Sequence, residues 1–268
     1  GPASLRELVD GKLAFFEKLK TAKNPLIVVG MGALAREDGA AVLALARELA
    51  EKLNAVREDW NGFAVLHTAA ARVAGLDLGL VPGEGGRDVA GILAGCEKGE
   101  IGAVYLLAAD EIDTKRLGKA FVIYQGHHGD AGAHRADVIL PGAAYTEKPG
   151  TYVNTEGRVQ LGRRAGYPPG DAREDWAILR ALSERLGKAL SYDTLAQVRS
   201  RLVAINKAFA AVDHQAPGAW GLFGKAGSTT DAPFASSVAN FYMTCPISRA
   251  SRTMAECMAS RAQLMAAE

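Results

Sequence analysis

The stretch Ala136-Asp137-Val138-Ile139-Leu140-Pro141-Gly142 is a short apolar run that ends on Pro-Gly. It predicts a buried strand whose carboxyl end opens into a loop. The polar segment that follows, residues 147–160, contains Gly150 and Gly157, and glycine adopts backbone angles that other residues avoid. We therefore expect a buried strand followed by a tight, irregular loop.

Four polar side chains of this segment are candidates for a structural role. They are Glu147, Asn154, Glu156 and Arg158, which can hydrogen-bond to the amides of the loop or to a bound ligand. We expect Asn154, Glu156 and Arg158 to brace the loop and the strand ahead of it, with no catalytic role. A buried arginine–carboxylate pair is the interaction that we expect for Arg158.

Other apolar runs predict that this strand has parallel neighbours. Strands are expected at residues 26–30, 103–107 and 121–124, and the run at 26–30 is typical of a strand covered on both faces. Helical spacing of apolar residues, with capping and stop signals, predicts helices at residues 1–20, 38–53, 62–73, 89–96, 173–187 and 193–209. The fold class is therefore α/β, a mostly parallel, doubly wound (Rossmann-like) sheet with helices on both faces.

The last part of the chain differs in composition. Residues 213–237 are rich in Gly, Ala, Ser, Thr and Pro, and a short helix is expected near residues 248–265. So few apolar anchors cannot easily offset the entropy lost when a backbone is ordered. We therefore divide the chain into an α/β domain, residues 1–212, and a docking tail, residues 213–268, held by its few aromatic side chains against that domain or an adjacent subunit.

Ligands of an open α/β sheet bind beyond the carboxyl ends of its strands. The candidates at those ends are Gly30, Gly32, Asp110, His127, His128 and Asp130. Gly30-Met31-Gly32 has no third glycine at the dinucleotide spacing, which favours a turn or packing role over a nucleotide. Adjacent histidines on an extended chain point in opposite directions, so solvated or hydrogen-bonded imidazoles are expected in place of a metal site.

Composition excludes several functional classes. The formal net charge of +1 gives no electrostatic case for binding nucleic acid or an anionic membrane surface. No apolar run approaches the ~18–20 residues that cross a bilayer, so no membrane insertion is expected. The three cysteines, Cys96, Cys245 and Cys257, form no C-x-x-C pair, whereas iron–sulfur and structural zinc sites need converging thiolates. We expect no catalytic residue, metal ligand or cofactor in this chain.

Four segments in order resemble one family. They are residues 124–130 with His127-His128-Gly129-Asp130, residues 136–160 with Asn154-Thr155-Glu156-Gly157-Arg158, residues 168–176, and residues 241–255. The middle segment resembles the molybdopterin oxidoreductase superfamily. Together the four resemble the large iron–sulfur subunits of respiratory NADH-quinone oxidoreductase (complex I), of the alphaproteobacterial and mitochondrial type.

The resemblance implies a function for the complex that this chain does not perform alone. Such complexes transfer electrons from NADH to quinone and translocate protons, which would make this chain part of an enzyme. The resemblance implies that iron–sulfur clusters lie in an amino-terminal part absent here, and the start at Gly1-Pro2-Ala3 without methionine suggests a fragment or a start left by processing. This part would be a structural and assembly region with a vestigial pocket, contacting other complex I subunits on the cytoplasmic or mitochondrial matrix side of an inner membrane.

Two alternatives stay open at this point. One is a working molybdopterin-guanine-dinucleotide domain of an active oxidoreductase, and the other is a free-standing nucleotide-binding module. The family usually has glycine where this chain has Ala108, just before Asp110. A side chain there narrows a place where a ligand would approach the backbone closely, which favours the structural role.

Overall fold

Parallel strands lie in two separate sheets in the computed structural model, which describes residues 1–215, 218–234, 236–238 and 240–267. The chain divides into two compact units. The first comprises Gly1–Ala74, Val153–Val159 and Asp213–Ala239, and the second comprises Gly75–Tyr152, Gln160–Val212 and Asn240–Glu268. Helix α5 (Arg72–Asp77) spans the boundary near residue 74.

The first unit is built on one parallel strand pair. Strand β1 pairs with β4 from Ile27 opposite Phe63 to Gly30 opposite Leu66, and β2 and β3 form a small antiparallel pair. The elements are α1 (Pro2–Val9), α2 (Phe15–Lys20), β1 (Ile27–Gly30), α3 (Met31–Leu34), α4 (Gly39–Lys52), β2 (Val56–Arg57), β3 (Trp60–Asn61) and β4 (Phe63–Leu66).

Helix α4 supplies most of the core of the first unit. Its residues Leu45 and Leu49 are buried with Val9 of α1, and Phe63 of β4 packs against this cluster. Burying one such aliphatic side chain contributes ~1.5–3 kcal/mol, so the helical spacing of these leucines fixes which face of α4 meets the sheet.

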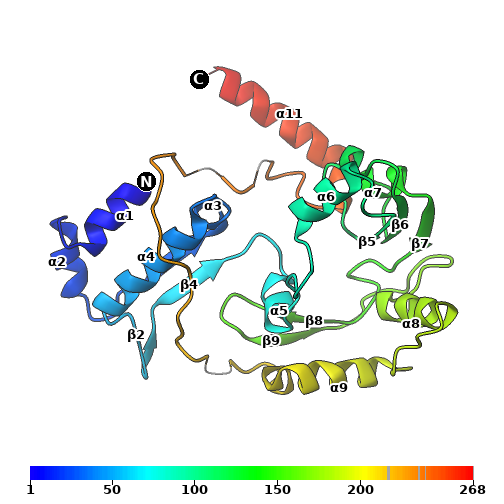
Figure 1. Ribbon diagram of the computed structural model, residues 1–268, viewed down its shortest axis with the longest axis horizontal. Coiled ribbons are helices and arrows are strands. Elements are labelled where there is room, and N and C mark those ends of the chain that lie inside the picture. The colour runs from blue at the N-terminus through cyan, green and yellow to red at the C-terminus, as the bar shows by residue number, and fades with distance from the viewer. Residues whose placement is uncertain (216–217, 235, 239, 268) are drawn as a thin grey trace. The chain divides into compact units, whose positions relative to one another are not determined.

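Residues 218–234, which we call the strap, run over this unit without regular secondary structure; they are drawn in orange in Figure 1. The rings of Trp220 and Phe223 lie 4.8 Å apart and each lies 5.3 Å from the ring of Phe63. Lys225 N donates a hydrogen bond to Ala40 O at 2.9 Å. The strap therefore docks its few aromatic side chains on the α/β body, as predicted.

A buried carboxylate holds the far end of the strap. Asp38 accepts hydrogen bonds from Arg36 Nε (2.7 Å), from Thr230 N (2.7 Å) and from the Thr230 hydroxyl (3.1 Å). Arg36 also donates to the carbonyl oxygens of Ala232 and Pro233. Asp38 immediately precedes α4 but makes no cap hydrogen bond to it, and instead holds residues almost two hundred positions away.

Lowering the pH is expected to weaken the hydrogen bonds that Asp38 accepts from Arg36 and Thr230. The Arg36 hydrogen bond, followed by the Thr230 amide, holds the pKa of Asp38 well below its ordinary value of 3.8. A carboxyl whose pKa is lowered by folding stabilises the protein above its unfolded-state pKa and loses that contribution as the pH falls. Asp38→Asn should therefore melt below the wild type at neutral pH, and the difference in Tm should shrink below about pH 4. A difference in Tm that stays constant with pH would contradict this assignment.

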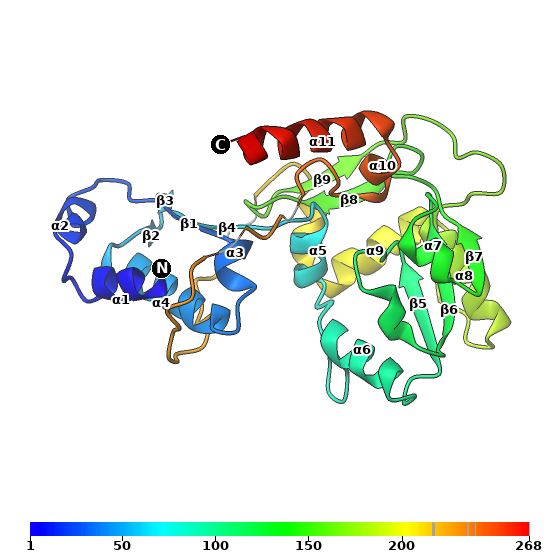
Figure 2. The same cartoon turned by 90° about the horizontal axis from the view of Figure 1, so that it is seen from above.

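The second unit contains a three-stranded parallel sheet in the order β5-β6-β7 (Figure 2). Ala103 lies opposite Phe121, and Ile123 lies opposite Val138. The elements are α6 (Val89–Glu97), β5 (Ala103–Leu107), η1 (Thr114–Leu117), β6 (Phe121–Gly126), α7 (Ala131–Arg135), β7 (Val138–Pro141), α8 (Asp175–Arg185), α9 (Leu195–Ile205), η2 (Lys207–Ala210), α10 (Pro246–Arg249) and α11 (Arg252–Ala267).

The two faces of this sheet are covered by different elements. On one face, Val122 and Tyr124 pack with Leu93 of α6 and Leu117 of η1 in a buried cluster. Gln125 points to the opposite face because side chains alternate along a strand, and there it meets the first residue of α8. The antiparallel strands β8 (Gly150–Val153) and β9 (Val159–Gly162) form a separate hairpin.

Most expected elements are confirmed. The α/β class with parallel sheets and helices is observed, as are the strands at β1, β5, β6 and β7 and the helices α4, α6, α8 and α9. The parallel strands of the described residues are divided between two sheets, however. The division of the chain into an α/β domain, residues 1–212, and a docking tail, residues 213–268, stays a prediction.

Several predictions about individual segments were wrong. The helix expected over residues 1–20 is interrupted between α1 and α2, where Asp10-Gly11 are poor helix formers. The helix expected over residues 62–73 is largely strand β4 with a turn after it, and the loop after Gly142 contains the β8–β9 hairpin. Strand β7 is an edge strand, not a buried one, and Ile139 is 55% exposed. Val28 of β1 is also exposed, because a two-stranded sheet leaves one face partly open.

Candidate functional site: the carboxyl edge of the second sheet

The carboxyl ends of β5 and β6 bring together acidic side chains that are distant in sequence. Asp110 follows β5, and Asp130 follows β6 and begins helix α7 with a hydrogen bond from Ala131 N to its Oδ1 (2.8 Å). Because parallel strands end at one edge of a sheet, both carboxylates lie at the place where an open α/β fold binds ligands. Both residues are among the candidates that the sequence analysis listed at the strand ends.

Arg249, from the carboxy-terminal helix α10, lies between the two carboxylates. Its Nη2 donates to Asp110 Oδ1 at 2.8 Å and its Nε donates to Asp130 Oδ2 at 2.5 Å. Its Nη1 lies 3.8 Å from Glu111 Oε1. Sequence reasoning had not assigned Arg249 to this edge, because nothing local ties residue 249 to residues 110 and 130.

Burial and hydrogen bonding shift the pKa values of several groups in this cluster. The side chain of Asp110 is 1% exposed, and its Oδ2 has no hydrogen-bond partner. Burial raises the pKa of Asp110, against the opposing effect of Arg249. Burial also raises the pKa of Tyr124 to about 12, with help from the charges of Asp110 and Asp130. For Asp130, burial is outweighed by the hydrogen bonds from Arg249 and Ala131, so its pKa lies below the ordinary value.

The two adjacent histidines face each other, contrary to the prediction that they point apart. Their Nδ1 atoms are 2.7 Å apart and the ring centroids are 4.9 Å apart. The reason is that β6 ends at Gly126, so His127 and His128 lie in a bend and not on an extended strand. A hydrogen bond between two imidazoles requires one Nδ1 to be protonated and the other to accept. Burial, then His128 and Lys148, lower the pKa of His127.

A second polar network lies on the α8 side of β6. Gln125 Nε2 donates to Asp175 Oδ1 at 2.8 Å, and its Oε1 accepts from the Tyr105 hydroxyl. Lys148 also donates to Asp175. None of these residues is among the candidates that the sequence analysis placed at the strand ends. The position of Asp175 at the start of a helix that follows the sheet was the available signal.

The two glycines of the candidate set do not join this cluster. Gly30 and Gly32 belong to the first unit, where they line a pocket of about 410 Å³. Apolar side chains make up the rest of the lining, including Val28, Val42 and Phe234. A Cβ built on Gly30 would meet nothing within 4 Å, so this glycine is not required by packing in the structure.

The predicted loop residues lie at the hairpin between β8 and β9 and just before it. Asn154 Oδ1 accepts hydrogen bonds from the backbone N of Glu156 and of Arg158, both at 3.0 Å. Glu147 Oε2 accepts from Ala144 N at 2.9 Å. Arg158 donates to Asp213 O at 2.8 Å, but its side chain is 37% exposed and its contact with Glu156 is 3.7 Å long. The expected buried pair is therefore an exposed one, which contributes at most ~1 kcal/mol.

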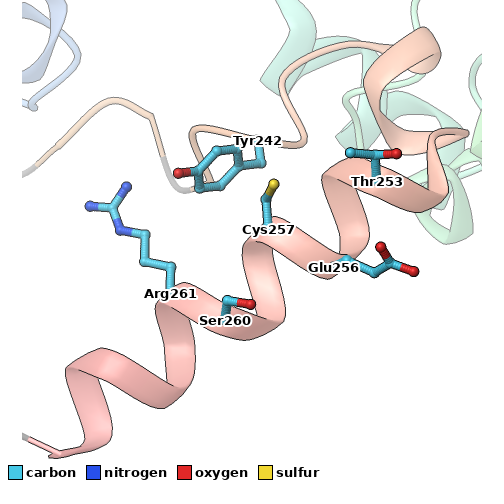
Figure 3. Close-up of a pocket in the computed structure, with 6 residues that line it drawn as sticks. All are labelled: Tyr242, Thr253, Glu256, Cys257, Ser260 and Arg261. Atoms are coloured by element: carbon cyan, nitrogen blue, oxygen red, sulfur yellow. The ribbon is translucent and has the colours of Figure 1, made fainter.

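A further pocket, of about 370 Å³, lies along helix α11 (Figure 3). Figure 3 shows the ring of Tyr242 beside Cys257, with Ser260 and Arg261 one turn further along the helix. No group of three or more His, Cys, Asp or Glu side chains in the described part of the chain is arranged to hold a metal ion.

The cluster does not suit a phosphate-bearing dinucleotide. Asp110, Glu111 and Asp130 carry up to three negative charges at the edge, whereas a pyrophosphate requires donors or cations. The cation closest to them, Arg249, is already bonded to two of these carboxylates. Ala108 also has a φ of 50°, a left-handed conformation that favours glycine, beside the same edge.

Comparison with known proteins identifies the family. The family model described as molybdopterin oxidoreductase matches residues 1–185, and the model for the C-terminal part of the G subunit of NADH-ubiquinone oxidoreductase matches residues 213–257. The chain belongs to the molybdopterin oxidoreductase family. The α/β fold with parallel sheets agrees with this membership.

Similar proteins are subunits of NADH dehydrogenases. The chain is 45% identical over 262 residues to the mitochondrial NADH dehydrogenase (ubiquinone) iron-sulfur protein 1 of Solanum tuberosum, covering 96% of this chain and 34% of that protein. It is 47% identical over 256 residues to the mitochondrial NADH-ubiquinone oxidoreductase 78 kDa subunit of Candida albicans, covering 91% and 34%. It is 38% identical over 260 residues to the G subunit of the NADH-quinone oxidoreductase of Rickettsia bellii, covering 97% and 37%.

The resemblance found in the sequence is thus confirmed. The chain spans about a third of the length of these relatives, which are oxidoreductase subunits by name. No helix in the described ranges is long and apolar enough to cross a membrane.

Proposed function

We propose that this chain is a structural and assembly region of the large iron–sulfur subunit of a proton-translocating NADH-quinone oxidoreductase. The supporting observation is identity of 38–47% to such subunits over more than nine-tenths of the chain. In this proposal the complex transfers electrons from NADH to quinone, and the iron–sulfur clusters of the subunit lie outside this chain. Its partners are other subunits of the complex, in the peripheral arm on the cytoplasmic or matrix side.

The charge at the carboxyl edge supports a structural role over a retained dinucleotide site. Carboxylates surround the edge, and the chain's own Arg249 is bonded to two of them. The candidate residues Asp110, His127, His128 and Asp130 then belong to a vestigial pocket, and Glu147, Asn154, Glu156 and Arg158 to a structural loop.

The purified chain is expected to show no redox chemistry of its own. Its three cysteines include one buried, one exposed and one partly exposed thiol, with no clustered set for an iron–sulfur centre among the described residues. Absorption spectra, iron and molybdenum analysis, and assays of NADH oxidation on the purified chain test this. A visible iron–sulfur or flavin band, or bound pterin, would refute the proposal.

The assembly role needs the full-length subunit in its complex. Deleting this region should abolish assembly on native gels. His127→Gln combined with His128→Gln removes both imidazoles while keeping hydrogen-bonding side chains, and should leave both assembly and quinone reduction unchanged. Normal assembly with a sharp fall in quinone reduction in this variant would assign a chemical role to the edge.

A further inference from the structure

The carboxyl edge of the β5–β6–β7 sheet presents two carboxylates at fixed positions. The side chain of Asp110 is buried, and Asp130 Oδ1 accepts a hydrogen bond from Ala131 N. Both carboxylates are carried by loops that follow adjacent strands. Together the two carboxylates can accept hydrogen bonds from one planar cation.

The guanidinium of Arg249 fits this pair by its shape as well as its charge. Nε and Nη2 lie on one side of the guanidinium and donate to carboxylates from two different loops. Nη1 lies 3.5 Å from Met243 O and 3.8 Å from Glu111. A planar fork of donors makes such contacts, whereas the point charge of a lysine cannot make both in the same plane.

The buried carboxylate of Asp110 requires a nearby cation when it is ionised. Its Oδ2 is buried without a partner, and its whole side chain is withdrawn from water. An ionised carboxylate in that position is costly unless a cation compensates it. Two histidines also interact with the pair by charge, His134 of α7 with Asp130 and His127 with Asp110, whereas Arg249 bonds to both carboxylates.

We infer that this edge is a guanidinium-binding site and that its occupant is Arg249 of the same chain, which latches helices α10 and α11 to the sheet. This inference rests on residues of the second unit alone and does not depend on the proposed function.

The test uses the full 268-residue chain and a chemical rescue. Arg249→Ala should lower the Tm by about 5 °C and speed hydrogen exchange in residues 240–263 at least about tenfold. Ethylguanidinium chloride at millimolar concentration should restore much of the lost Tm, and equal concentrations of sodium chloride or urea should not. Arg252→Ala, which removes a 93% exposed arginine three residues away, is the matched control and should change neither property.

A second variant separates the latch from a general loss of packing. Asp110→Asn in the Arg249→Ala background removes the uncompensated buried charge, so it should recover part of the Tm and abolish the response to ethylguanidinium. If Arg249→Ala does not fold, Arg249→Lys replaces it; because the lysine keeps the charge but not the planar fork of donors, it should show a smaller loss of Tm and a smaller rescue by ethylguanidinium. An Arg249→Ala protein that melts and exchanges like Arg252→Ala, or a loss of Tm that ethylguanidinium does not reverse, would overturn the inference.

Discussion

Gly224→Ala is expected to lower the free energy of unfolding by about 2–4 kcal/mol and to release the strap from α4. Gly224 has a φ of 74°, which an alanine adopts only with strain. A Cβ at this position would lie 2.4 Å from Ala44 N and 2.8 Å from Ala40 O. Both atoms belong to the backbone of α4, so no side-chain rotation relieves the contact. The strap must therefore lift away from the helix.

The measurements are chemical denaturation and hydrogen exchange. Residues 218–234 should lose protection, while the β5–β6–β7 sheet should keep it. Gly221→Ala is the matched control, because it lies three residues away with no left-handed φ and nothing within 4 Å of an added Cβ. Equal stability of the two variants would mean that the strap does not dock through residue 224. Because it has so few apolar anchors, we also expect the strap to be the least stable part of the chain, and wild-type protection there as strong as that of residues 26–30 would contradict this expectation.

The sequence predicted elements that local patterns define. Burial of one or both faces produces a recognisable pattern of apolar residues in a strand or a helix. Such patterns placed β1, β5, β6 and α4 correctly. The acidic residues of the site followed from the same logic, because parallel strands end at a common edge. Asp110 and Asp130 were therefore found without any knowledge of their partner.

The errors come from contacts between residues distant in sequence. Arg249 lies 139 residues from Asp110 and 119 from Asp130, and neither residue signals that pairing. The segment at residues 62–73 was predicted as a helix from Phe63, Leu66 and Val73. The same residues fit strand β4, and the choice depends on whether β1 is available to pair with it.

The backbone contacts of Gly62 explain why β4 forms a strand. Replacing this glycine should have the second large effect that we expect. Gly62 N donates to Ala55 O at 2.7 Å, and Ile27 N donates to Gly62 O at 2.7 Å. The hydrogen bond between Ile27 N and Gly62 O joins the start of β4 to the start of β1. A Cβ at residue 62 would lie 2.1 Å from Pro25 O and 2.8 Å from Ala55 O, so the backbone is enclosed on two sides.

Gly62→Ala should therefore prevent β1 and β4 from pairing in register and cost about 4 kcal/mol or more, at the upper end of single substitutions. Hydrogen exchange of residues 27–30 and 63–66, with denaturant unfolding, measures both effects. Gly30→Ala, at the other end of β1, is the control, since an added Cβ there meets nothing within 4 Å and the stability should stay within ~0.5 kcal/mol of the wild type. If Gly62→Ala unfolds like Gly30→Ala, the close backbone approach does not exist in solution and the pairing of β1 with β4 must rest on other contacts.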